Sequence, residues 1–135
     1  MINTQLDHIG LNVADLATSI AFYQDLFGFA LIAQWDDPKQ AFIGAGDTVL
    51  GLIEQPDYDY HAYTMAHLAF SCTAFDFPNL VEKVQALGLD IVSGPKPQRD
   101  GETLLFRDPS GNILEVCYPA MGVWQALQTP KKINC

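Results

Sequence analysis

The chain has 135 residues, of which 49% are hydrophobic and 17% are charged. It is long enough to bury the core of one domain, and its apolar content excludes an intrinsically disordered chain. The net charge is −9 and no stretch is rich in Lys or Arg. This argues against nucleic acids and anionic membranes as partners, because both bind basic clusters.

The first 55 residues predict a βαβββ module. Residues 5–13 have the apolar content and alternation of a strand. Asp15 then fits a helix N-cap, and Gly28 fits the residue that ends the helix. Three further strands follow, with turns between them, at residues 29–35, 40–43 and 48–53.

The second half of the chain predicts the same order of elements again. Residues 55–64 contain Pro, Asp and three tyrosines and read as a linker. The elements expected after it are a strand at 65–72, a helix from about Asp76 to Gly88, a strand at 89–92, a loop at 93–97, and strands at 102–107 and 112–118. Residues 119–135 predict a tail that packs loosely or against a partner.

A repeat relates the two halves. His8 and His67 open equivalent strands 59 positions apart, and Gly28 and Gly88 end equivalent helices 60 positions apart. Each module would have a sheet with one uncovered face, so we expect the two modules to stack in one α+β domain spanning residues 1–135. Module one then covers about residues 5–55, and module two about 65–118.

Three side chains in strand-like runs predict a metal site: His8, His67 and Glu115. Two imidazoles and one carboxylate with open positions suit Mn(II), Fe(II), Zn(II) or Ni(II). A single histidine in a strand is more often an ordinary hydrogen-bonded residue. The repeat-equivalent positions of His8 and His67, with Glu115 in a matching context, favour ligation.

Cysteine usage and hydropathy indicate the compartment. The three cysteines form no Cys-x-x-Cys pair, which argues against a disulfide scaffold or a zinc ribbon. No apolar run approaches the roughly 20 residues of a membrane helix. The first residues also lack the features of a signal peptide. We therefore expect a soluble cytoplasmic protein.

Four segments carry a resemblance to a known family: Leu6–Leu16, Ser19–Phe29, His67–Phe70 and Phe106–Glu115. Together they resemble the vicinal oxygen chelate superfamily, which includes glyoxalase I, fosfomycin-resistance thiol transferases, extradiol dioxygenases and bleomycin-binding proteins. The resemblance covers residues 5 to about 118. It implies two tandem βαβββ modules forming a curved mixed sheet around a metal-binding cavity. It also implies a homodimer, often with the metal shared between modules of two chains.

The resemblance also assigns ligand positions. His8 and His67 match the two first-strand ligands of the family, and Glu115 matches the last-strand ligand of module two. A gapless match places Gly51, which cannot ligate, at the fourth position. Glu54 lies three residues later, on the opposite face of a regular strand, and a slip or bulge there leaves Glu54 open as a fourth ligand.

These assignments bear on the reaction. Glyoxalase I uses one metal-bound glutamate in each module to move a proton, and Gly51 removes one of them unless Glu54 takes its place. The fosfomycin thiol transferases share the three-ligand set, and their potassium-binding loop corresponds to residues 99–103. Their phosphonate-holding Lys, Tyr and Arg fall on Pro95, Leu105 and Trp124 here, which argues against fosfomycin itself.

We therefore expect a metal-dependent enzyme that acts on a small electrophilic metabolite or xenobiotic by thiol addition or isomerisation. A divalent metal would act as Lewis acid, and a thiol is a candidate cosubstrate. The alternatives are an extradiol iron dioxygenase, whose second acid-base histidine would have to be His61, and a non-catalytic binder of a small molecule such as an antibiotic. Candidate pocket residues are Trp35, Phe42, Gly51, Arg99, Leu105 and Cys117.

Overall fold

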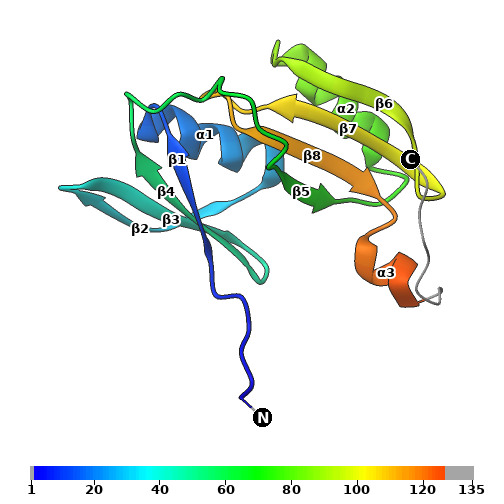
Figure 1. Cartoon of the computed structure of the whole chain (residues 1–135), viewed down its shortest axis with the longest axis horizontal. Helices are drawn as coiled ribbons and strands as arrows, with labels where there is room; N and C mark the ends of the chain where they lie inside the picture. Colours follow the sequence, from blue (N-terminus) through cyan, green and yellow to red (C-terminus); the bar gives the residue numbers. More distant parts are fainter. Residues whose placement is uncertain (1, 127–135) are drawn as a thin grey trace. The chain divides into compact units, whose positions relative to one another are not determined.

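A computed structural model describes the backbone of residues 2–126 and the side chains of residues 2–123. The chain divides into two compact units. Unit 1 comprises Met1–Tyr63 and Asp108–Asn112, and unit 2 comprises Thr64–Arg107 and Ile113–Cys135. Each unit contains one four-stranded mixed sheet with a helix between its first and second strands (Figure 1). The expected α+β class with two βαβββ modules is confirmed. The strands form two separate hydrogen-bonded sheets instead of the one mixed sheet that was expected.

Unit 1 has the element order that its sequence predicts. Its sheet has the strand order β1-β4-β3-β2, with β1 parallel to β4 and the other neighbours antiparallel. The Asp15 side chain caps helix α1 by accepting a hydrogen bond from the Thr18 N–H at 2.9 Å. Gly28 ends the helix with φ 72°, a left-handed conformation that suits glycine. The elements are β1 (Ile9–Val13), α1 (Leu16–Phe27), β2 (Ala30–Asp36), β3 (Lys39–Ala45) and β4 (Thr48–Glu54).

The core of unit 1 lies between α1 and the sheet. The apolar stripe of α1 is buried, and so are alternate residues of β3 and β4. Side chains alternate along a strand, so Phe42 and Gly51 lie on the other face of the sheet, where they are direct partners across β3 and β4. The buried side chains are Leu16, Ile20, Tyr23, Leu26, Ala41, Ile43, Leu50 and Leu52.

The turn from Asp108 to Asn112 belongs to unit 1, although the sequence places it in module two. One Asp108 carboxylate oxygen accepts hydrogen bonds from the N–H groups of Ser110, Gly111 and Asn112 at 2.9–3.0 Å. The other accepts from the hydroxyl of fully buried Tyr23 at 2.8 Å. Burial, and next the charge of Asp108, raise the pKa of Tyr23 well above its usual range. The turn therefore supplies the polar partner that the core of unit 1 needs.

Unit 2 repeats the order and extends one strand beyond the prediction. Its sheet has the order β5-β8-β7-β6, with β5 parallel to β8. The loop expected at residues 93–97 lies inside β6, so that expectation is wrong. β6 is an edge strand whose pairing with β7 shifts register twice, and edge strands accommodate proline. The elements are β5 (Leu68–Ser71), α2 (Phe77–Ala86), β6 (Ile91–Gln98), β7 (Gly101–Arg107), β8 (Ile113–Tyr118) and α3 (Met121–Ala126).

The two histidines that were expected within strands lie just before them. β1 begins at Ile9 and β5 at Leu68, one residue after His8 and His67 respectively. The expected tail contains helix α3, and residues 127–135 lie outside the described part of the chain. None of the helices in the described residues is long and apolar enough to cross a membrane.

Candidate metal centre

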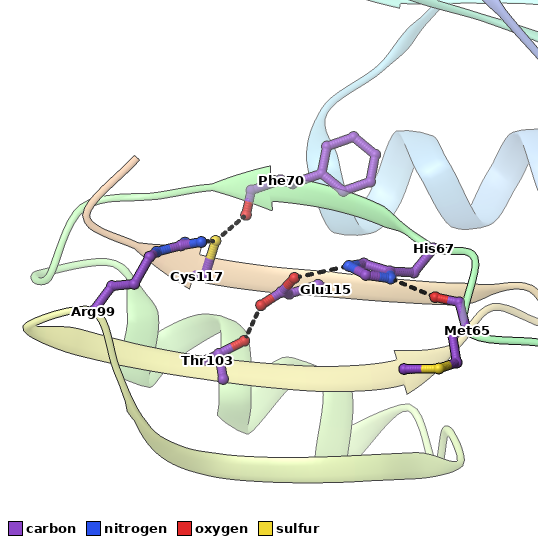
Figure 2. A network of polar contacts seen from close by, with 7 residues as sticks. All are labelled: Met65, His67, Phe70, Arg99, Thr103, Glu115 and Cys117. Carbon is purple, nitrogen blue, oxygen red and sulfur yellow. Dashed lines mark hydrogen bonds and ion pairs between the residues drawn. The ribbon is translucent and has the colours of Figure 1, made fainter. Parts of the chain in front are cut away.

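His67 and Glu115 meet on the sheet of unit 2. β5 runs parallel to β8, and Ala69 is the register partner of Glu115. This pairing brings His67 Nε2 to 3.2 Å from Glu115 Oε1 (Figure 2). The Glu115 side chain is 8% exposed and that of His67 is 38% exposed, so the pair is open to a ligand mainly from the histidine side.

The other polar atom of each side chain, Nδ1 of His67 and Oε2 of Glu115, is hydrogen-bonded to a different group. His67 Nδ1 lies 2.9 Å from the Met65 carbonyl oxygen. A carbonyl oxygen only accepts hydrogen bonds, so Nδ1 carries a proton, and in the neutral imidazole Nε2 then holds the lone pair that a metal can bind. The buried Thr103 hydroxyl donates to Glu115 Oε2, which leaves Oε1 for a further partner. Two atoms of types that can bind a metal thus converge, and each side chain is oriented by an outer hydrogen bond, as metal ligands usually are.

His8, in unit 1, shows the same orientation rule. Its Nδ1 lies 2.7 Å from an Asp7 carboxylate oxygen, and in the neutral imidazole with its proton on Nδ1 the Nε2 atom is able to bind a metal. The His8 ring packs edge-on against Phe42, with ring centroids 5.0 Å apart. Within each unit, the described side chains form no group of three or more His, Cys, Asp or Glu close enough to hold one ion.

Gly51 and Glu54, the two candidates for the fourth position, have different surroundings in unit 1. The pairing of β4 with β1 and β3 has no register shift, so no bulge turns Glu54 toward that face. Glu54 Oε2 instead accepts a hydrogen bond from the Leu16 N–H at 3.0 Å, at the start of α1. A Cβ on Gly51 would lie 3.7 Å from His8 Cδ2 and 3.0 Å from Phe42 Cε1. Gly51 therefore occupies the position beside His8, and the Phe42 ring fills the space of a side chain.

The candidate pocket residues fall into two groups. In unit 1, Trp35 packs edge-on against Phe42 with ring centroids 5.7 Å apart, and Phe42 in turn lies against His8 and Gly51. These aromatic rings are partly exposed rather than part of the core.

In unit 2, Leu105 is the register partner of Glu115 on β7, and Cys117 follows Glu115 by two positions on β8. Arg99 Nη2 donates to Cys117 Sγ at 3.5 Å. Burial, and next the charge of Glu115, raise the pKa of the Cys117 thiol, against a smaller opposing effect of Arg99.

The residues that orient the ligands were not identified from the sequence. Asp7, Met65 and Thr103 each hold one candidate ligand. Asp7 directly precedes His8, and that adjacency was the one available signal. Met65 acts through its backbone carbonyl and Thr103 across two strands, so neither role is visible in a linear pattern.

Replacing Thr103 with valine is expected to lower the affinity for a divalent metal about 10- to 100-fold. Valine keeps the shape of threonine but removes the hydroxyl that orients Glu115, and losing such an outer partner usually has this effect. Calorimetric titration with Mn(II) measures it. Thr103→Ser keeps the hydroxyl and should restore most of the affinity, while equal affinities for Thr103→Val and the unaltered protein would contradict the assignment.

Comparison with known proteins identifies the family. The family model described as the glyoxalase/bleomycin resistance protein/dioxygenase superfamily matches residues 5–116. The chain is 31% identical over 124 residues to virulence protein STM3117 of Salmonella typhimurium, covering 86% of this chain and 85% of that protein. It is 32% identical over 117 residues to the metallothiol transferase FosB of Shouchella clausii, covering 82% of this chain and 77% of that protein.

Solved structures show the same fold. The fosfomycin resistance protein FosX of Listeria monocytogenes, complexed with Mn(II) and sulfate, superposes with a TM-score of 0.79 at 23% identity. The similarity covers 93% of this chain and 98% of that one. As the sequence motifs predicted, the chain belongs to the glyoxalase/bleomycin resistance protein/dioxygenase superfamily.

Proposed function

We propose that the chain is a metal-dependent enzyme that adds a thiol to a small electrophilic metabolite or xenobiotic. The observation that carries this proposal is the convergence of His67 Nε2 and Glu115 Oε1 at 3.2 Å, each with its other polar atom engaged elsewhere. FosB, a relative at 32% identity, is named a metallothiol transferase. FosX, which shares the fold, was solved with Mn(II).

The proposed ligands are His8, His67 and Glu115. Two neutral imidazoles and one carboxylate suit Mn(II), Fe(II), Zn(II) or Ni(II), and such an ion supplies Lewis acidity to a bound oxygen. His67 and Glu115 come from one unit and His8 from the other. We propose that the protein is a homodimer and that each site takes His8 from one chain and the other two ligands from its partner.

Gly51 favours thiol addition over isomerisation. Isomerisation of the glyoxalase type needs a second carboxylate to move a proton, and the position beside His8 holds Gly51 and the Phe42 ring instead. In the addition, the thiolate sulfur forms a bond to an electrophilic carbon, for example of an epoxide. The carbon–oxygen bond breaks with its electron pair on oxygen, which then takes up the proton released by the thiol. No proton has to move between substrate carbons.

The other two functions find less support in the site. Ring cleavage by a dioxygenase would use His61 as a second acid-base group, and His61 is exposed in the linker, its backbone N–H bonded to Asp59. A non-catalytic binder has no need of the oriented donors on His67 and Glu115.

The test is thiol consumption by protein reconstituted with one metal at a time. Metal-free protein, and protein loaded with Mn(II), Fe(II), Zn(II) or Ni(II), is incubated with a low-molecular-weight thiol and a panel of epoxides and α-ketoaldehydes. We expect equimolar loss of thiol and epoxide that requires a metal. The proposal fails if no metal supports thiol loss, if only the isomerised α-ketoaldehyde adduct forms, or if Fe(II) and oxygen cleave catechols instead.

A further inference from the structure

Arg99 lies in a backbone conformation that arginine rarely adopts. Gln98 pairs with Gly101, so Arg99 and Asp100 alone form the turn between β6 and β7, with φ of 47° and 65°. The type I′ turn, a common two-residue hairpin turn, requires this left-handed conformation at both residues, and its usual residues are Asn, Asp and Gly. An arginine is strained there relative to glycine, and strained residues are concentrated at functional sites.

The guanidinium of Arg99 is partly buried without a counter-charge. Nη2 donates to Cys117 Sγ at 3.5 Å, and Nε is buried without a hydrogen-bond partner. Among the described residues, none of the ion pairs involves Arg99. Burying an unpaired charge is unfavourable, so binding of an anionic group to this side chain would lower that cost.

The position of Arg99 connects it to the candidate metal centre. Glu115 and Cys117 are two positions apart on β8, so their side chains lie on one face about 7 Å apart. Figure 2 shows Arg99 extending to Cys117 along β8, beside the Glu115–His67 pair. A small molecule that contacts Arg99 can therefore also reach Glu115 Oε1 and His67 Nε2.

We infer that Arg99 binds a carboxylate group of the substrate, which makes the substrate a small electrophile bearing one carboxylate. Guanidinium and carboxylate match in geometry and form two parallel hydrogen bonds. One positive charge matches one negative charge, whereas a phosphonate dianion would bring excess negative charge toward Glu115. This inference rests on the proposed function for the electrophile, but the carboxylate site itself can be tested without a metal.

The test is a titration of metal-free, ¹⁵N-labelled protein with propionate, followed by NMR. The backbone signals of Arg99 and Cys117 should shift saturably with propionate, but not with propionamide, its neutral analogue. Arg99→Met should weaken propionate binding about tenfold or more, because it removes a charge-assisted hydrogen bond. A parallel titration uses methylphosphonate, which should bind more weakly than propionate.

Matched variants separate this role from a structural one. Lys96→Met removes an exposed cation of the same hairpin and should leave propionate binding unchanged. Arg99→Gly removes the side chain while suiting the left-handed turn, so it should fold at least as well as the unaltered protein and still lose binding. Mn(II) affinity should be the same in all these variants.

Three results would overturn the inference. The first is equal propionate affinity in the unaltered protein and in both Arg99 variants. The second is equal binding of propionate and propionamide, and the third is tighter binding of methylphosphonate. If propionate binds through Arg99 while Mn(II) does not bind at all, the proposed metal-dependent function fails and the carboxylate site stands.

Discussion

Replacing His67 with alanine, or Glu115 with glutamine, is expected to abolish tight metal binding. The two side chains present Nε2 and Oε1 to each other at 3.2 Å, and each substitution removes one of the converging donors. Loss of an outer partner alone usually lowers metal affinity 10- to 100-fold, so loss of a ligand should lower it by at least about 100-fold. Titration with Mn(II), followed by the electron paramagnetic resonance signal of the free ion, measures the change.

The third histidine of the chain provides the control. His61 is exposed in the linker, so His61→Ala should bind Mn(II) as tightly as the unaltered protein. The ligand assignment would be contradicted if His67→Ala kept its Mn(II) affinity, or if His61→Ala lost it to the same extent.

Mixing two inactive variants tests where His8 acts. His8→Ala and His67→Ala should each lose metal binding and thiol transfer. If each site takes His8 from one chain and His67 from its partner, a mixed dimer contains one intact site and one doubly altered site. Random reassociation should then restore about a quarter of the activity, as expected for a symmetric dimer. Sites built within single chains would show no recovery.

Replacing Asp108 with alanine is expected to lower the free energy of unfolding by about 3–5 kcal/mol, a large effect for a single residue. The Asp108 side chain is buried and accepts from the Tyr23 hydroxyl and from three backbone N–H groups of its own turn. It also accepts from Asn112 Nδ2 at 3.1 Å. Alanine would remove an acceptor from the buried Tyr23 hydroxyl and from the Ser110 and Asn112 N–H groups, whereas the Gly111 N–H keeps the Asp108 carbonyl and Asn112 Nδ2 keeps the Asn12 carbonyl. Urea unfolding of metal-free protein measures the loss.

Two variants show whether the loss comes from this network. Tyr23→Phe removes one hydrogen bond and should lower the free energy of unfolding by about 1–3 kcal/mol. Asp47→Ala, at an exposed turn of the same unit, should change it by less than about 0.5 kcal/mol. A loss below that of Tyr23→Phe would show that Asp108 does not hold the turn.

The interaction between Tyr23 and Asp108 can also be followed spectroscopically. Burial, and next the negative charge of Asp108, raise the pKa of Tyr23. Asp108→Asn removes the charge, so the Tyr23 phenol should ionise at lower pH in this variant, as long as the protein stays folded. Ultraviolet absorbance of tyrosinate during an alkaline titration reports this change.

Local patterns determined the elements of this protein and the family to which it belongs. The Asp15 cap, the left-handed Gly28 and the buried face of α1 follow from helix spacing and capping chemistry, which act over a few residues. The recurrence of these signals predicted two equivalent modules. The expectation of a loop at residues 93–97 was wrong because Pro95 and Pro97 are tolerated in a strand at the edge of a sheet. Whether a strand lies at the edge depends on how the whole sheet is assembled.

Tertiary structure decided how the candidate site is built. The sequence left Gly51 and Glu54 open at the fourth position, and the uninterrupted register of β4 placed Gly51 beside His8 and Glu54 at the start of α1. Likewise, Thr103 and Glu115 meet only because β7 and β8 pair. Hydrogen bonds between strands depend on register, and register is set by how whole elements pack rather than by neighbouring residues. The types of the candidate ligands could therefore be predicted from the sequence, whereas the hydrogen bonds that orient His67 and Glu115 emerged only once the strands were paired.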